Sequence, residues 1–174
     1  MARKKWTFKK TDNESGKVSD RLYTLCVYLL DGLITEELCG KTISRTIQIR
    51  GDQTLEDLHH IIFNAFDRED EHLYEFNLGV GPEDRTAIYS LHNNTQGSVF
   101  DEEIAGDVAA VTIESLGLKV GRAFGYLFDF GDDWLHQINV IGIENFTGTG
   151  SGKYPKIVAR EGKSPSQYPE IEED

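Results

Sequence analysis

The pattern of apolar and polar residues predicts a hairpin near the start of the chain. Residues 22–30 are rich in β-branched, aromatic and aliphatic side chains, which is typical of a buried strand. Residues 43–50 alternate, so three isoleucines and one arginine share a face: Ile43, Arg45, Ile47 and Ile49. The turn-rich stretch 31–40 lies between the two runs. The pattern therefore predicts two strands joined by a loose loop.

The period of the pattern then changes to that of a helix, over residues 54–66. Thr54 is a favourable N-cap, and Asp57 stands three residues later, in the capping-box position. Apolar side chains recur at helical spacing and form a stripe: Leu55, Leu58, Ile62, Ala65 and Phe66. His59 flanks this stripe and His60 points away from it. The order strand, strand, helix resembles the start of β-grasp-like domains.

The middle of the chain predicts a second pair of strands followed by irregular structure. Residues 73–80 alternate and indicate a strand that Gly81 and Pro82 end, and residues 86–91 indicate its hairpin partner. Turn residues and acids predict a surface loop over 92–107. A short helical turn is expected at 112–118.

A third hairpin carries the strongest concentration of polar groups in the chain. Residues 123–130 and 134–143 indicate two strands joined by Gly131, Asp132 and Asp133, residue types that tolerate the positive φ of tight turns. From residue 145 onward Gly, Ser, Pro and charge predict a tail that wraps the surface.

Together these elements predict a single α+β domain over residues 21–169. Its sheet is mixed or antiparallel, one main helix packs on it, and the arrangement is β-grasp-like. Residues 1–20 are expected to form a basic, mobile N-terminal tail, and residues 170–174 an acidic, frayed C-terminus.

Composition agrees with one globular domain. The chain has 174 residues, of which 39% are hydrophobic and 28% charged. No apolar run approaches the ~20 residues of a membrane span, and no apolar segment follows the basic start as in a signal peptide. Cys26 and Cys39 show no metal-ligand spacing. We therefore expect a soluble, reduced, cytoplasmic protein.

The charge is unevenly distributed along the chain. The net charge is −12, yet residues 1–10 carry five basic side chains and no acidic one. The other residues hold 13 basic against 30 acidic side chains, a net charge of −17. Since such a body repels phosphate backbones, we do not expect nucleic acid as its partner. The lack of an apolar span gives the separate expectation that the protein has no membrane partner. The basic tail is either solvated or in contact with an anionic partner.

The candidate chemistry lies at the third hairpin, where acids, a tryptophan and a histidine gather: Asp129, Asp132, Asp133, Trp134 and His136. Clustered carboxylates bind hard cations, and histidine adds affinity for zinc, manganese or iron. His59 and His72 would complete such a site if the fold brings them near. In the alternative, structural interpretation, Asp132 and Asp133 bond turn amides, and His136 pairs with Asp129 or with a backbone carbonyl across the hairpin. We favour the structural interpretation, with no metal and no cofactor.

Arg45 is a further candidate, because a charge among isoleucines must be paired or reach the surface. We expect a buried ion pair with an acidic side chain. The alternative is an arginine that binds anions in a cleft.

Four segments together resemble the plasmid pRiA ORF-three-like family: residues 54–59, 72–76, 128–138 and 154–156. The resemblance spans about residues 21–169 and implies a compact α+β domain without a defined activity. Some members are labelled transposon resolvases. Many relatives are cysteine-rich near the C-terminus, whereas residues 154–166 here contain no cysteine, so a metal site of that kind is not implied.

Three classes of function follow. The first is a binding or scaffold module of unknown partner, without a catalytic constellation. The second is a metal-assisted hydrolase, in which Asp129, Asp132 and His136 hold the ion, bound water loses a proton, and His72 or His136 moves protons. The third, an accessory protein of a mobile element, rests on the family label. Scattered arginines and an acidic body argue against a recombinase. The Asp-Phe-Gly triplet at residues 129–131 is also found in kinases, but the missing Gly-rich loop argues against that class.

Overall fold

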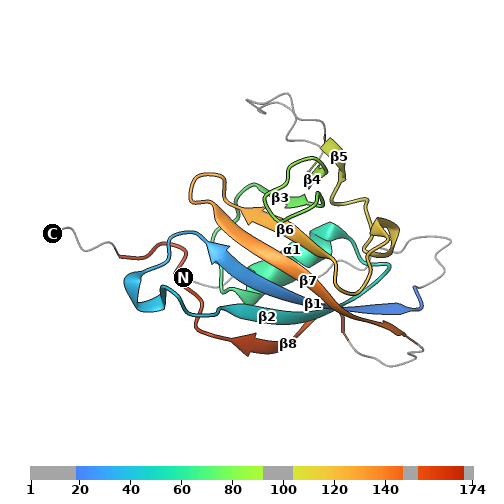
Figure 1. Ribbon diagram of the computed structural model, residues 1–174, viewed down its shortest axis with the longest axis horizontal. Helices are drawn as coiled ribbons and strands as arrows, with labels where there is room; N and C mark the ends of the chain where they lie inside the picture. The colour runs from blue at the N-terminus through green and yellow to red at the C-terminus, as the bar shows by residue number, and fades with distance from the viewer. Residues whose placement is uncertain (1–18, 92–103, 147–152, 171–174) are drawn as a thin grey trace.

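One sheet of eight strands forms the frame of the molecule (Figure 1). The computed structural model describes residues 19–91, 104–146 and 153–170. The strands are β1 (Arg21–Asp31), β2 (Ser44–Arg50), β3 (Tyr74–Asn77), β4 (Ile88–Ser90), β5 (Ile104–Asp107), β6 (Ala123–Phe128), β7 (Trp134–Asn145) and β8 (Lys156–Glu161). They lie in the order β5-β4-β3-β6-β7-β1-β2-β8. Only β4 and β5 pair in parallel, so the sheet is mixed.

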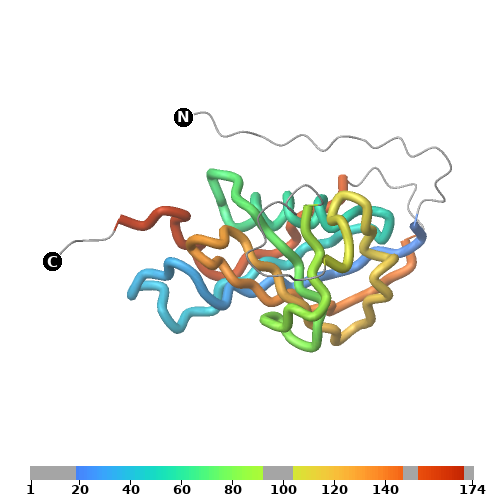
Figure 2. The backbone as a smooth tube through the Cα atoms, turned by 90° about the horizontal axis from the view of Figure 1, so that it is seen from above, coloured from blue at the N-terminus to red at the C-terminus, as the bar shows by residue number. Residues whose placement is uncertain are grey.

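The α-helix α1 (Leu55–Ala65) packs on one face of this sheet, as the view from above shows (Figure 2). Two short 3-10 helices, η1 (Glu36–Leu38) and η3 (Glu114–Leu116), lie in loops. The predicted stripe of α1 is fully buried. It shares the core with the inward side chains of β6 and β7: Phe124, Tyr126, Phe128, Trp134 and Ile138. The predicted α+β architecture is confirmed, but a β-grasp-like arrangement is not.

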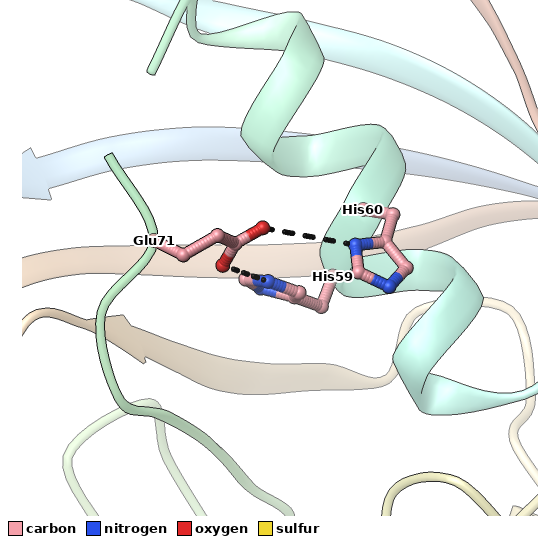
Figure 3. Close-up of side chains that lie close together, drawn as sticks. All are labelled: His59, His60 and Glu71. Atoms are coloured by element: carbon pink, nitrogen blue, oxygen red, sulfur yellow. Dashed lines mark hydrogen bonds and ion pairs between the residues drawn. The ribbon is translucent and has the colours of Figure 1, made fainter. Parts of the chain in front are cut away.

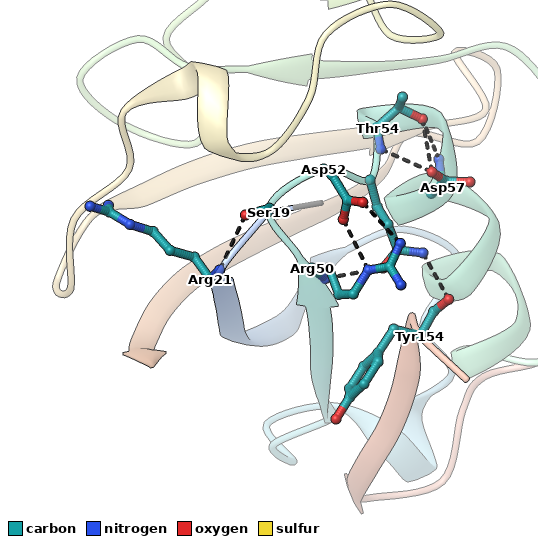
Figure 4. Close-up of polar contacts among 8 residues, drawn as sticks. Ser19, Arg21, Arg50, Asp52, Thr54, Asp57 and Tyr154 are labelled. Carbon is teal, nitrogen blue, oxygen red and sulfur yellow. Dashed lines mark hydrogen bonds and ion pairs between the residues drawn. The ribbon is translucent and has the colours of Figure 1, made fainter. Parts of the chain in front are cut away.

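The start of α1 is fixed by the predicted capping box (Figure 4). The Thr54 hydroxyl accepts from the Asp57 amide at 3.1 Å, and the Asp57 carboxylate accepts from the Thr54 amide at 2.9 Å. Just before the helix, Arg50 pairs with Asp52 at 2.9 Å. Two otherwise unpaired helix donors are thereby satisfied, which fixes where the helix begins.

The predicted hairpins are present. β1 pairs antiparallel with β2, and β3 with β4, although β3 is shorter than the expected strand at 73–80. β6 and β7 pair antiparallel from Phe128 opposite Trp134 onward. The turn at the tip uses positive φ at Asp133 (50°), one of the three residues expected to allow it, and at Asp129 (63°), which was expected in the strand.

Two predictions about irregular segments are wrong in part. Residues 104–107, expected in a surface loop, form the edge strand β5; residues 92–103 lie outside the described residues. Residues 156–161, expected in a wrapping tail, form the other edge strand, β8, which pairs with β2. β8 is exposed at five of its six residues and β5 is only half-buried, so neither strand carries an apolar alternation that could be recognised in the sequence. No helix within the described ranges is long and apolar enough to cross a membrane.

Arg45 is 2% exposed, as predicted, but the expected ion pair is wrong. In the part of the chain that is described, its guanidinium donates to oxygens of neutral groups: Ala65 O (2.8 Å), Ser44 O (2.6 Å), Glu161 O (2.8 Å), Gly162 O (3.1 Å) and Ser164 Oγ (2.6 Å). It also lies 5.0 Å from the centre of the Phe66 ring. The residue ties β2 to the end of α1 and to the chain beyond β8.

Candidate functional site

The polar turn between β6 and β7 is organised by Asp129 rather than by the exposed acids beside it. The Asp129 carboxylate is nearly buried and accepts from the amides of Gly131 (3.0 Å) and Asp132 (3.4 Å). The amide of Asp133 donates to the Asp129 carbonyl at 2.7 Å. The expectation that Asp132 and Asp133 would bond the turn amides is therefore wrong, because Asp129 already does so from inside the turn.

His136 lies in the core and not at the turn. It is 1% exposed, and its Nδ1 faces the Tyr126 carbonyl across the hairpin at 3.3 Å, so the predicted pairing with a backbone carbonyl is present. Burial, and then the positive charge of Arg68, lower the pKa of His136 to about 3. The ring is therefore neutral at pH 7, with its proton on Nδ1.

Trp134, also predicted as a site residue, is fully buried beneath Arg68, whose guanidinium carbon lies 3.7 Å from a Trp134 ring centre. Burial lowers the pKa of Arg68 to about 10, so the side chain remains charged at pH 7. Within the described residues its three nitrogens have no hydrogen-bond acceptor, and Trp134 Nε1 and His136 Nε2 also lack a partner. Stacking on the indole and the nearby negative charges of Asp67 and Asp129 compensate for this buried charge.

The structure does not bring Asp129, Asp132 and His136 together as metal ligands. In the described ranges, one set of three acidic, cysteine or histidine side chains has its ligand atoms within 4.8 Å of one another, and it contains none of these three. His72 does reach Asp129, with 3.4 Å between Nε2 and Oδ2, and it also reaches the Tyr168 hydroxyl at 3.0 Å. These contacts fasten the turn to the rest of the molecule.

The set that does converge is His59, His60 and Glu71 (Figure 3). The two histidines are consecutive on α1, and Glu71 stands opposite them on the loop between α1 and β3. His59 Nε2 lies 3.0 Å from one Glu71 oxygen, and His60 Nδ1 lies 3.9 Å from the other. Ligands on a tetrahedral zinc with bonds of about 2.0–2.1 Å are about 3.3 Å apart. The two separations lie on either side of that value.

His59 is held rigidly from behind. Its side chain is 1% exposed, and its ring stacks on Tyr74 with 3.6 Å between centres and 2° between planes. Nδ1 lies 2.7 Å from the Tyr126 hydroxyl. Burial lowers the pKa of His59, and the neighbouring Glu71 only partly offsets this. The imidazole is therefore neutral at pH 7, which is the form that binds metals.

His59 was predicted only as a remote addition to the hairpin acids, and Glu71 was not predicted as a site residue. Helical spacing places His59 and His60 about 100° apart, so the pattern assigns them to different sides of α1. Only the return of the chain after the helix brings a carboxylate between them. Two adjacent histidines followed by an acidic loop are the sequence signal that was present.

Comparisons with known proteins identify the family of this chain. A family model described as plasmid pRiA4b ORF-3-like protein matches residues 34–168. This chain belongs to that family. The match confirms the resemblance, and it includes α1, the loop with Glu71, and the hairpin of β6 and β7. A comparison with curated proteins finds no match.

A solved structure shares the fold of this chain. It is the crystal structure of a protein of unknown function from Methanosarcina mazei Go1, with a TM-score of 0.65 and 22% identity over 87% of this chain and 76% of that chain. The similarity concerns the fold and assigns no activity.

Proposed function

We propose that this protein is a binding module that acts through a divalent transition-metal ion held by His59 Nε2, His60 Nδ1 and the Glu71 carboxylate. The observation that carries the proposal is the convergence of these three ligand atoms within 4.8 Å. Two imidazoles and one carboxylate suit zinc, iron and related ions better than calcium or magnesium.

The surroundings of His59 support the proposal. Coordination through Nε2 places the ring proton on Nδ1, where it is donated to the Tyr126 hydroxyl 2.7 Å away. Metal-bound histidines ordinarily make such a hydrogen bond through their second nitrogen, which fixes the tautomer and the orientation of the ring. Because Tyr126 is itself fully buried, it cannot turn away.

The proposed site has three protein ligands, which leaves a coordination position for an outside group. Structural zinc sites have four protein ligands, whereas open sites have three and a water or bound ligand. The side chains of His60 and Glu71 are 22% and 36% exposed, so the site lies close to the surface. We infer that the fourth ligand comes from the molecule that the module binds.

Calorimetric titration of the metal-free full chain with zinc at pH 7 tests the proposal. We expect one zinc per chain. Glu71→Gln and His60→Ala should each weaken binding by more than the ~10–100-fold that changes around the ligands produce. His72→Ala, a histidine outside the set, is the matched control and should bind as the wild type does.

Two results would contradict the assignment. One is a wild type that binds no zinc, or a Glu71→Gln variant with unchanged affinity. The other is loss of zinc binding in His136→Asn with retention in Glu71→Gln, which would place the metal at the hairpin of β6 and β7 instead.

The same open position favours a second candidate, metal-assisted hydrolysis, because an ion with a free position acidifies bound water. Zinc-loaded protein that cleaves nitrophenyl esters or phosphodiesters, with the activity lost in Glu71→Gln, would establish it. Zinc binding without turnover would favour the binding module over the hydrolase.

A further inference from the structure

The loop that carries Glu71 is held on both sides of that residue by the C-terminal segment, residues 162–170. On one side, the Gln167 side-chain oxygen accepts from the amides of Glu69 (2.7 Å) and Asp70 (3.1 Å), and its nitrogen donates to the Asp70 carbonyl (3.0 Å). On the other side, the Tyr168 hydroxyl meets His72 Nε2 at 3.0 Å. Glu71 thus stands between two fastened positions.

Gln167 acts here as a substitute for a strand partner. It is 1% exposed, and a buried amide side chain is tolerated only when its hydrogen bonds are made. The backbone of Glu69 and Asp70 lies outside any helix or strand, so these groups have no ladder partners. The side chain supplies two acceptor contacts and one donor contact to one short stretch of backbone.

The C-terminal segment is itself anchored. Arg45 donates to Gly162 O at 3.1 Å and to Ser164 Oγ at 2.6 Å, and Pro165 is buried. Gln167 is therefore presented to the loop from a fixed base, and the loop position depends on whether the segment is docked.

We propose that Gln167 is a positioning residue of the His59, His60 and Glu71 site, and that docking of the C-terminal segment is coupled to metal binding. The inference rests on the proposed function. Ordering the residues of a free loop costs conformational entropy, and without Gln167 that cost falls on the metal-binding step. By linkage, the ion must in turn stabilise the docked segment.

The experiment compares zinc affinity in the wild type, Gln167→Ala and Lys163→Ala, with full chains at a temperature where circular dichroism shows all three folded. Lys163 is an exposed residue of the same segment and serves as the control. We expect Gln167→Ala to bind zinc about tenfold more weakly, and Lys163→Ala to match the wild type. Gln167→Glu keeps an acceptor for the two amides and should lose less affinity than Gln167→Ala.

Amide hydrogen exchange supplies a readout that a loss of overall stability would not mimic. Zinc should slow exchange at Glu69 and Asp70 in the wild type, and this protection should be reduced in Gln167→Ala. Should Gln167→Ala fail to fold, Gln167→Glu is compared with the wild type instead: it lacks the donor to the Asp70 carbonyl and should bind zinc more weakly, and equal affinity would refute the coupling. If the wild type binds zinc but Gln167→Ala binds it equally well, the coupling is refuted while the metal site stands. A wild type that binds no zinc refutes the site itself.

Discussion

At the scale of single residues, two buried arginines show different solutions to the same problem. Arg45 donates to carbonyl and hydroxyl oxygens around it, whereas Arg68 lies over the Trp134 ring without an acceptor in the described residues. Burial lowers the pKa of both guanidinium groups. A charge can thus be accommodated by backbone dipoles or by an aromatic face without a direct ion pair.

His136 gives the prediction that belongs to this scale. Its pKa is about 3 in the folded protein and about 6.5 as a free side chain. Above pH 6.5 both the folded and unfolded forms are neutral, so the residue has no pH-dependent effect. Below that value the unfolded chain takes up a proton that the folded chain cannot, so stability falls as the pH falls. From pH 6.5 to 4.5 the loss is about 2–3 kcal/mol.

The measurement is urea unfolding of the wild type and His136→Asn at both pH values. Carboxylates and His59 titrate in both proteins, so the difference between the two pH dependences isolates His136. The variant is expected to lose about 2–3 kcal/mol less on acidification. Equal losses in the two proteins would mean that His136 takes up its proton in the folded state.

At the scale of elements, α1 serves two purposes with different faces. One face buries the apolar stripe against the sheet, while His59, buried beside that stripe, and the more exposed His60 both meet the loop that follows. The helix can position metal ligands only because the core holds it in place.

Leu58→Ala tests the packed face of α1. Leu58 is fully buried, so the substitution should lower the free energy of unfolding by about 2–5 kcal/mol through lost burial and a residual cavity. Urea denaturation measures it, and Glu56→Ala, at a half-buried position of the same helix, is the control. A change below roughly 0.5 kcal/mol for Leu58→Ala would mean that this face does not carry the core.

Elements with a strong period could be predicted from the sequence, and elements without one could not. The capping box and stripe of α1, and the hairpins, follow from local spacing. β5 and β8 were missed because edge strands owe their structure to a neighbour, and the partners of Arg45 lie as far away in the chain as Ser164. The candidate site was missed for the same reason, since Glu71 meets the histidines only through the path of the folded chain.

At the scale of the whole molecule, the two ends of the described chain meet in one sheet. β1, near the start, lies between β7 and β2, and β8, near the end, covers the edge of β2. β8 is mostly exposed and buries little apolar surface. Its removal should therefore cost little hydrophobic free energy, and most of the lost stability should come from broken polar contacts.

A chain ending at Phe146 tests this expectation, because it lacks Glu161, Gly162 and Ser164. Arg45 would keep only the carbonyls of Ser44 and Ala65 and would remain a buried, underpaired charge. We expect a loss of more than about 3 kcal/mol in urea unfolding, the scale for breaking a buried charged interaction.

Arg45→Met should destabilise the full chain but stabilise the shortened one, because only in the shortened chain does the charge lack its acceptors. If the shortened chain does not fold, recovery of folded protein by Arg45→Met is the readout. The same sign of effect in both backgrounds would show that Arg45 does not link the C-terminal segment to the sheet.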